Sequence, residues 1–182
     1  LLHSYNTSNS ALSNNVVLCF TERDGRIWAG TNGGGINIID PEEGRITVLS
    51  HVSGNPASFP AQSIKSIYTD TYGNIWAGSM RDGLIQVSSS EMKTYSESHL
   101  GTKAGMSNTT VLCLHQDPES RFIWIGTDGD GINRFDPETN EFTHYWSTAN
   151  SKVVSITDFS KDELALSIYS EGIIIFNKNT GQ

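Results

Sequence analysis

One sequence pattern recurs along the chain at a fixed spacing. The stretch GRIWAGTNGGGINIID, residues 25–40, returns as GNIWAGSMRDGLIQVS and again as RFIWIGTDGDGINRFD. The tryptophans of these copies, Trp28, Trp76 and Trp124, stand 48 residues apart. A fourth and more divergent copy, DELALSIYSEGIIIFN, has Leu164 where the tryptophan is expected. A period of about 40 to 50 residues predicts a row of like structural units rather than an irregular globule.

Each of the first three copies contains four short apolar runs bounded by Gly, Pro, Asn and Asp, and the fourth copy contains three. Runs such as VLCLHQ, IWIG, GINRF and EFTHY are rich in Ile, Val, Thr and aromatic residues, as β-strands are. Nowhere do apolar residues recur at i, i+3, i+4 and i+7 over three turns, so we expect almost no helix. Four antiparallel strands per repeat predict an all-β fold, a β-propeller of about four blades.

Two glycines accompany each tryptophan, two and seven residues after it. We expect the tryptophans to pack between neighbouring blades, and the later glycine to permit a positive φ or a close backbone approach. The stretch GTNGGG fits neither G-x-G-x-x-G nor a P-loop, so the glycines are structural. The recurring positions are Trp28, Trp76 and Trp124, then Gly30, Gly78 and Gly126, and last Gly35, Gly83 and Gly131.

Composition excludes several kinds of partner. The 182 residues include 12 Lys and Arg against 20 Asp and Glu, and the cations are scattered, so we expect no nucleic-acid partner. No run of about 18 apolar residues occurs, so we expect no membrane contact by this segment. The stretch DGDGINRFD lacks the EF-hand glycine, and we expect no metal and no cofactor. Cys19 and Cys113 fall in the first and third copies, with a whole blade expected between them, so we predict no intramolecular disulfide.

The repeat resembles the two-component regulator propeller repeat, whose pattern is V-x-x-I-x-x-D-x-x-G-x-I-W-x-G-T, then glycine, a short strand, Asp-Pro and F-x-x-Y. The first copy has Glu22 where aspartate is usual. The second copy matches at Ile64, Ile67, Asp70, Gly73, Ile75, Trp76 and Gly78. The third copy adds Thr127, Gly131, Phe135, Asp136, Phe142 and Tyr145.

This resemblance implies the periplasmic sensor region of a bacterial hybrid two-component regulator, which is an inner-membrane protein. The full-length protein would carry histidine kinase activity and control glycan-utilisation genes, whereas this segment would be non-catalytic. The implied ligand is an oligosaccharide. The other implied partners are the remaining blades and domains of the same sensor, and a homodimer stays open.

The resemblance also implies seven-bladed propellers, so we expect this segment to be an arc of a larger ring. We expect residues 1–14 to be the last strand and loop of a preceding blade. Blades 1 to 3 are expected at residues 15–60, 61–107 and 108–150, and an incomplete blade 4 at 151–182. Alternatively, the first strand completes the last blade, which gives a four-bladed ring or a pairing of two chains.

The sequence contains no H-E-x-x-H, G-x-S-x-G or paired cysteine-histidine motif, so we predict no catalytic residue. In propellers, ligands usually meet the face formed by the loops that join strands two and three and strand four to the next blade. Sugars bind aromatic rings and planar polar groups. The candidate ligand-binding residues on such loops are Arg81, Asp82, Asp130, Trp146 and Tyr169. Two alternatives stay open: a propeller lyase or hydrolase with a site assembled from loops, and a scaffold that binds proteins.

Overall fold

A computed structural model describes residues 3–88, 91–96, 105–145 and 151–182. These residues form fifteen β-strands in four antiparallel sheets, and no helix. Blade 1 consists of β1 (Val17–Arg23), β2 (Arg26–Thr31), β3 (Ile36–Asp40) and β4 (Arg45–Leu49). Blade 2 consists of β5 (Ile64–Thr69), β6 (Ile75–Ser79), β7 (Leu84–Val87) and β8 (Met92–Tyr95). Blade 3 consists of β9 (Val111–Gln116), β10 (Ile123–Thr127), β11 (Ile132–Asp136) and β12 (Glu141–Tyr145). Blade 4 consists of β13 (Val153–Ser160), β14 (Glu163–Ile168) and β15 (Gly172–Asn177).

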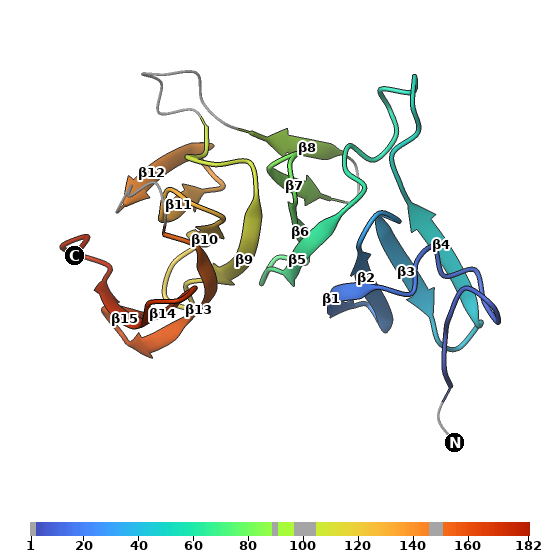
Figure 1. Cartoon of the computed structure of the whole chain (residues 1–182), viewed down its shortest axis with the longest axis horizontal. Helices are drawn as coiled ribbons and strands as arrows, with labels where there is room; N and C mark the ends of the chain where they lie inside the picture. The colour runs from blue at the N-terminus through green and yellow to red at the C-terminus, as the bar shows by residue number, and fades with distance from the viewer. Residues whose placement is uncertain (1–2, 89–90, 97–104, 146–150) are drawn as a thin grey trace.

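The four sheets follow one another around an arc, with blades 1 and 4 at its two ends (Figure 1). The first strands β1, β5, β9 and β13 are successive neighbours, and the second strand of each blade also contacts the first strand of the next. Within each sheet the strands pair in chain order. This arrangement confirms the prediction of an all-β propeller arc of about four blades.

The hydrophobic core is divided among the three seams between blades. Trp76 and Trp124 are fully buried, at 0% and 1% exposure, whereas Trp28 is partly buried. Each ring packs in the cluster that its own blade forms with the following one. Aromatic rings cross the seams as well: the centroids of Trp76 and Phe135 are 5.6 Å apart in a T-shaped contact. The regular spacing of the tryptophans in the sequence therefore reflects one tryptophan at each of the three seams.

The earlier glycine of each repeat lies where the next blade crosses most closely. A Cβ atom on Gly30 would lie 2.7 Å from Ile64 Cγ2 of blade 2, closer than packed carbon atoms approach. Gly78 and Gly126 face the same obstacle, because a Cβ there would overlap the first strand of the following blade. This requirement for close approach explains the earlier glycine, for which the sequence alone offers no reason.

The later glycine forms a backbone bridge across the seam. Gly83 has a φ of 80°, and its N–H donates to the carbonyl of Thr109 at the start of blade 3, with N···O 3.0 Å. Gly35 and Gly131 also have positive φ and make the equivalent bonds to the next blade. Each turn between second and third strands is thus fastened to the following blade.

The strand register corrects the assignment of Leu164 to the tryptophan position of blade 4. Trp124 pairs with His115, and the equivalent pair in blade 4 is Ala165 with Thr157. Leu164 points to the other side of the sheet and is buried in the cluster that contains Trp124. Because side chains alternate between the faces of a strand, the one-residue difference exchanges the two faces. Blade 4 therefore has alanine, not leucine, in place of the tryptophan.

The register also shifts by one residue at Glu22, which the sequence pattern places at the position of Asp70. The Asp70 N–H donates to the Asn74 carbonyl two residues before Trp76, and the equivalent position in blade 1 is Arg23, which pairs with Arg26. The Asp70 carboxylate accepts a bond from Trp76 Nε1 at 2.8 Å. Arg23 instead places its guanidinium carbon 5.9 Å from the centre of the Trp28 ring.

Candidate functional site

One edge of the arc carries both kinds of loop that were expected to meet a ligand. The turns between second and third strands comprise residues 32–35, 80–83, 128–131 and 169–171. Each turn is bonded to the segment that enters the first strand of its own blade, as Met80 N is to Ser63 O at 3.0 Å. We call this edge the loop face. Backbone bonds hold its turns in place from two sides, so side chains there extend from a fixed frame.

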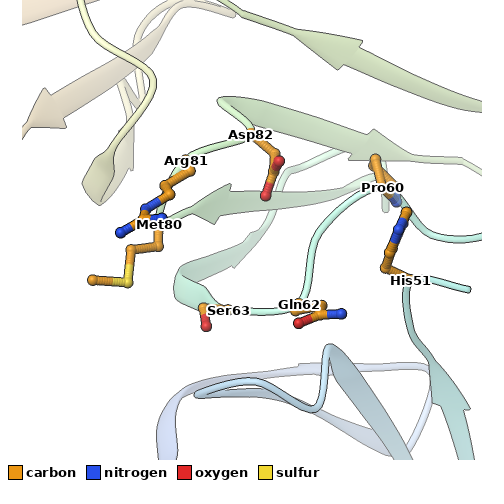
Figure 2. A pocket seen from close by; sticks show the side chains of 7 residues that line it. All are labelled: His51, Pro60, Gln62, Ser63, Met80, Arg81 and Asp82. Carbon is orange, nitrogen blue, oxygen red and sulfur yellow. The ribbon is translucent and has the colours of Figure 1, made fainter. Parts of the chain in front are cut away.

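A cavity of about 360 Å³ opens on the loop face between blades 1 and 2 (Figure 2). Its wall is formed by the β6–β7 turn and by the connection from β4 to β5. The lining residues are His51, Pro60, Gln62, Ser63, Met80, Arg81 and Asp82. We call it the 1–2 cavity. Its volume lies within the roughly 300–1,000 Å³ that is usual for ligand sites.

Several polar side chains of the 1–2 cavity have no partner among the residues that the structure describes. The backbone of the turn is fixed, because Asp82 N donates to Ser79 Oγ at 2.6 Å. The guanidinium of Arg81 and the carboxylate of Asp82 make no hydrogen bond or ion pair within the described part of the chain. The same holds for the His51 ring and the Gln62 amide. In Figure 2, Arg81 and Asp82 extend to different sides of the turn. The cavity therefore offers both donors and acceptors to a ligand.

Blades 1 and 3 have a hydrogen-bonded pair of polar side chains at the equivalent place. Asn37 Nδ2 donates to Ser13 Oγ at 2.7 Å, and the Ser13 N–H donates to Asn37 Oδ1 at 2.9 Å. Asn133 and Ser107 repeat this exchange at 2.9 and 3.0 Å. Both asparagines are fully buried. The exchange ties the segment before the first strand to the third strand of the blade.

Blade 2 lacks this exchange. Ile85 pairs with Ala77 as Asn37 pairs with Ala29, so isoleucine stands at the asparagine position. Pro60 stands four residues before β5, where blade 1 has its serine. Neither side chain can make the bonds found in the neighbouring blades. The 1–2 cavity is thus found at a blade that departs from the repeat.

A second polar contact is also missing in blade 2. Asn14 Nδ2 donates to the carbonyl of a turn residue in blade 1 at 2.7 Å, and Asn108 Nδ2 donates to the Asp130 carboxylate in blade 3 at 3.3 Å. Ala61 stands at this asparagine position in blade 2. Asp82, the counterpart of Asp130, therefore receives no side-chain donor from the described ranges and remains available there.

Of the four predicted ligand-binding residues that the structure describes, two lie together. Arg81 and Asp82 line the 1–2 cavity. Asp130 lies on the blade 3 turn and is bonded by Asn108, and Tyr169 lies on the blade 4 turn with 64% of its surface exposed. Neither lines the 1–2 cavity. Trp146 lies outside the described residues.

His51 and Gln62 are lining residues that the sequence did not single out. Both belong to the long connection SHVSGNPASFPAQS between β4 and β5, a loop type expected on this face. His51 also lines an adjoining cavity of about 290 Å³, with Gly54, Asn55 and Pro56. The two cavities meet at His51, so an extended ligand could contact both.

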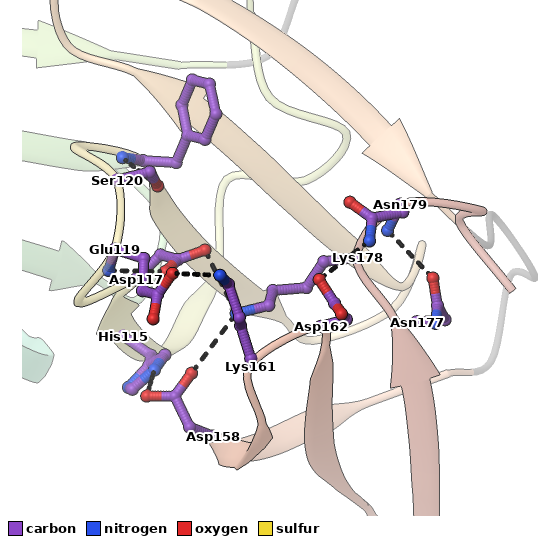
Figure 3. Close-up of polar contacts among 11 residues, drawn as sticks. His115, Asp117, Glu119, Ser120, Asp158, Lys161, Asp162, Asn177, Lys178 and Asn179 are labelled. Atoms are coloured by element: carbon purple, nitrogen blue, oxygen red, sulfur yellow. Dashed lines mark hydrogen bonds and ion pairs between the residues drawn. The ribbon is translucent and has the colours of Figure 1, made fainter.

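The opposite edge holds a network of charged residues at the seam of blades 3 and 4 (Figure 3). Lys178 Nζ lies 3.3 Å from an Asp117 oxygen and 3.7 Å from an Asp158 oxygen. His115 Nε2 is 3.0 Å from the other Asp158 oxygen. The Lys178 and Asp117 side chains are only 9% and 10% exposed. The Lys178–Asp117 and His115–Asp158 contacts each join a residue of blade 3 to a residue of blade 4, so the network links the two blades.

Other site types find no support in the described ranges. No group of three or more His, Cys, Asp and Glu side chains there could hold a metal ion. No helix in those ranges is long and apolar enough to cross a membrane. Cys19 and Cys113 are free thiols, with Sγ 3.6 Å from Ile64 O and 3.4 Å from Val153 O.

The fold and the seams define the chain as an arc of a β-propeller. Residues 11–33 and 58–81 match the sequence model of the two component regulator propeller family. The match confirms, for these two segments, the resemblance to two-component regulator propeller repeats that was recognised in the sequence. No curated protein gives a significant match.

Solved structures with similar folds include two from B. thetaiotaomicron. The extracellular domain of BT3049, described as a hybrid two component system, gives a TM-score of 0.85 at 21% identity over 99% of this chain. The extracellular domain of BT4673, described in the same way, gives 0.75 at 19% over 91%. PorZ, a surface component of the type-IX secretion system of Porphyromonas gingivalis, gives 0.72 at 14% over 100%. This chain spans 25%, 21% and 29% of those three chains, respectively.

Proposed function

We propose that this chain is a ligand-binding propeller region in the extracytoplasmic sensor of a bacterial hybrid two-component regulator. The ligand is an oligosaccharide, and the whole protein, through a histidine kinase, controls genes for glycan use. The observation that carries the proposal is the 1–2 cavity, where Arg81 and Asp82 have no partner within the described ranges of the chain. The match to two-component regulator propeller repeats and the fold shared with extracellular domains of such systems support the sensor role.

The lining of the 1–2 cavity suits a sugar. Met80, 39% exposed, and Pro60 present apolar surface for the C–H side of a sugar ring. Arg81 donates, Asp82 accepts, and Gln62 does both, which matches the mixed demands of ring hydroxyls. The fixed backbone of the turn lets these groups bind with little loss of conformational entropy.

The proposal gives the segment no catalytic step. Ser63 is the hydroxyl in the cavity, and its Oγ donates to Asn32 Oδ1 at 3.1 Å rather than to the His51 ring. A serine nucleophile needs a base within hydrogen-bond reach. Signalling instead requires that the ligand bind one arrangement of neighbouring domains more tightly than another.

The test is calorimetry on the complete extracytoplasmic region with a panel of chemically different oligosaccharides. We expect one class to bind and to remain uncleaved on long incubation. Alanine at both Arg81 and Asp82 should weaken that binding at least tenfold, about 1.4 kcal/mol. Cleavage products would favour the lyase or hydrolase alternative. Binding of a protein or peptide with no response to any glycan would favour the scaffold.

A further inference from the structure

The position of Arg81 is occupied by a small residue in every other blade. The second-to-third turns place Gly33, Gly129 and Ser170 at the equivalent position. Gly33 and Gly129 have φ values of 98° and 110°, and Ser170 has 65°, all in the left-handed half of the map. Arg81 is not among the residues with positive φ. Blade 2 therefore has a different turn backbone, one that a long side chain can adopt.

Arg81 has no carboxylate partner among the described residues, whereas several other cations of the chain are paired. Arg26 is 3.1 Å from Asp40, and Lys152 on the loop face is 2.7 Å from Asp128. The Arg81 guanidinium makes no such contact among the described residues, although Asp82 is its neighbour in sequence. A planar guanidinium with free N–H groups fits a carboxylate or sulfate with two parallel hydrogen bonds.

The Asp82 carboxylate, in contrast, needs hydrogen-bond donors. Its counterpart Asp130 accepts a bond from Asn108, but Ala61 removes the corresponding donor in blade 2. An unpartnered carboxylate at a cavity wall is matched by donors on the ligand, such as vicinal hydroxyl groups. Because Arg81 and Asp82 extend to different sides of the turn, one ligand can satisfy both at separate points (Figure 2).

We propose that the 1–2 cavity recognises an acidic sugar, with its carboxylate or sulfate on Arg81 and its hydroxyls on Asp82. This inference rests on the proposed function and specifies its ligand. The chain has a net charge of −8, which repels anions at a distance. Recognition of an acidic sugar therefore depends on a local cation, and Arg81 is the cation that lines this cavity.

The experiment uses the complete extracytoplasmic region and matched ligands. The probes are uronate-bearing oligosaccharides, the same oligosaccharides after chemical reduction of their carboxyl groups, and sulfated oligosaccharides of equal length. We expect a uronate or a sulfated probe to bind at least tenfold more tightly than the uncharged probe. The Arg81→Gln variant should abolish that preference, so that it binds the acidic and the uncharged probes with affinities within about twofold of each other. Arg45→Gln removes the same charge from an exposed residue of β4 and should change nothing.

The outcomes separate this inference from the proposed function. If an uncharged glycan binds as tightly as its acidic form, or if Arg81→Gln and Arg45→Gln behave alike, the acidic-sugar inference is wrong and the sensor proposal survives. If no glycan of any charge binds, both are wrong. A preference for uronate over sulfate, or the reverse, identifies which anion Arg81 holds.

Discussion

At the scale of single residues, the glycine of each second strand is explained by the blade that follows it. The three close approaches involve Gly30, Gly78 and Gly126, and each leaves no space for a methyl group. We predict that Gly78→Ala lowers the free energy of unfolding by about 1–3 kcal/mol, because Val111 must move away. Chemical denaturation provides the measurement. Gly44→Asn is the control, since nothing lies near Gly44 and asparagine tolerates its φ of 65°. Equal effects of both changes would contradict the close-approach argument.

The two thiols lend themselves to a second prediction at this scale. Burial raises the pKa of Cys19 and of Cys113 from the ordinary 9.0 to about 12. The folded state keeps these protons while the unfolded state loses them above about pH 9, so stability should fall from pH 9 upward. At pH 8 both thiols should react slowly with an alkylating reagent until denaturant is added. A Cys113→Ala variant should lose less stability between pH 9 and 10.5 than the unaltered chain. Rapid alkylation of the folded protein would contradict the prediction.

At the scale of strands and blades, the charged network around Lys178 fastens blade 3 to blade 4. We predict that Lys178→Met lowers the free energy of unfolding by about 3 kcal/mol, because it leaves the 10% exposed Asp117 carboxylate without its cation. The double variant Lys178→Met, Asp117→Asn should recover much of the loss, since no charge then remains unpaired. Lys161→Met is the control, because its pair with Glu119 is exposed. Additive effects of the two substitutions would contradict the coupling.

The strands and blades also show which parts of the fold and of the candidate site could be predicted from the sequence. The 48-residue spacing was sufficient for the blades, because every copy repeats strand-forming runs and turn residues. It failed at Leu164 and Glu22, where a hairpin of different length shifts the register by one residue and exchanges the faces of a strand. Arg81 and Asp82 could be proposed from their place in a turn. The cavity beside them could not, because Pro60, Ala61 and Ile85 are unremarkable until the strand register identifies the polar residues they replace.

At the scale of the whole molecule, the two end blades each present one apolar face that no other blade covers. In blade 1, Phe20 is 75% exposed, whereas its counterpart Ile67 in blade 2 is 9% exposed. In blade 4, Ile173 is 76% exposed, although the counterparts in the three other blades are fully buried, as Ile132 is. The three seams show what such faces do: each is buried against a neighbouring blade.

We therefore predict that the 182-residue segment, produced by itself, associates through these end faces. Sedimentation at rising protein concentration should show growing particles, and a dye that fluoresces on apolar surfaces should bind. The double variant Phe20→Ser, Ile173→Ser should reduce both signals, because it removes the largest exposed apolar group at each end. Tyr72→Ser is the matched control, since Tyr72 is 77% exposed but lies in the β5–β6 turn, away from the end faces. A segment that stays monomeric at every concentration and binds no dye would show that these faces are not sites of association. If Tyr72→Ser reduced both signals as much as the double variant does, general surface hydrophobicity rather than blade packing would drive the association.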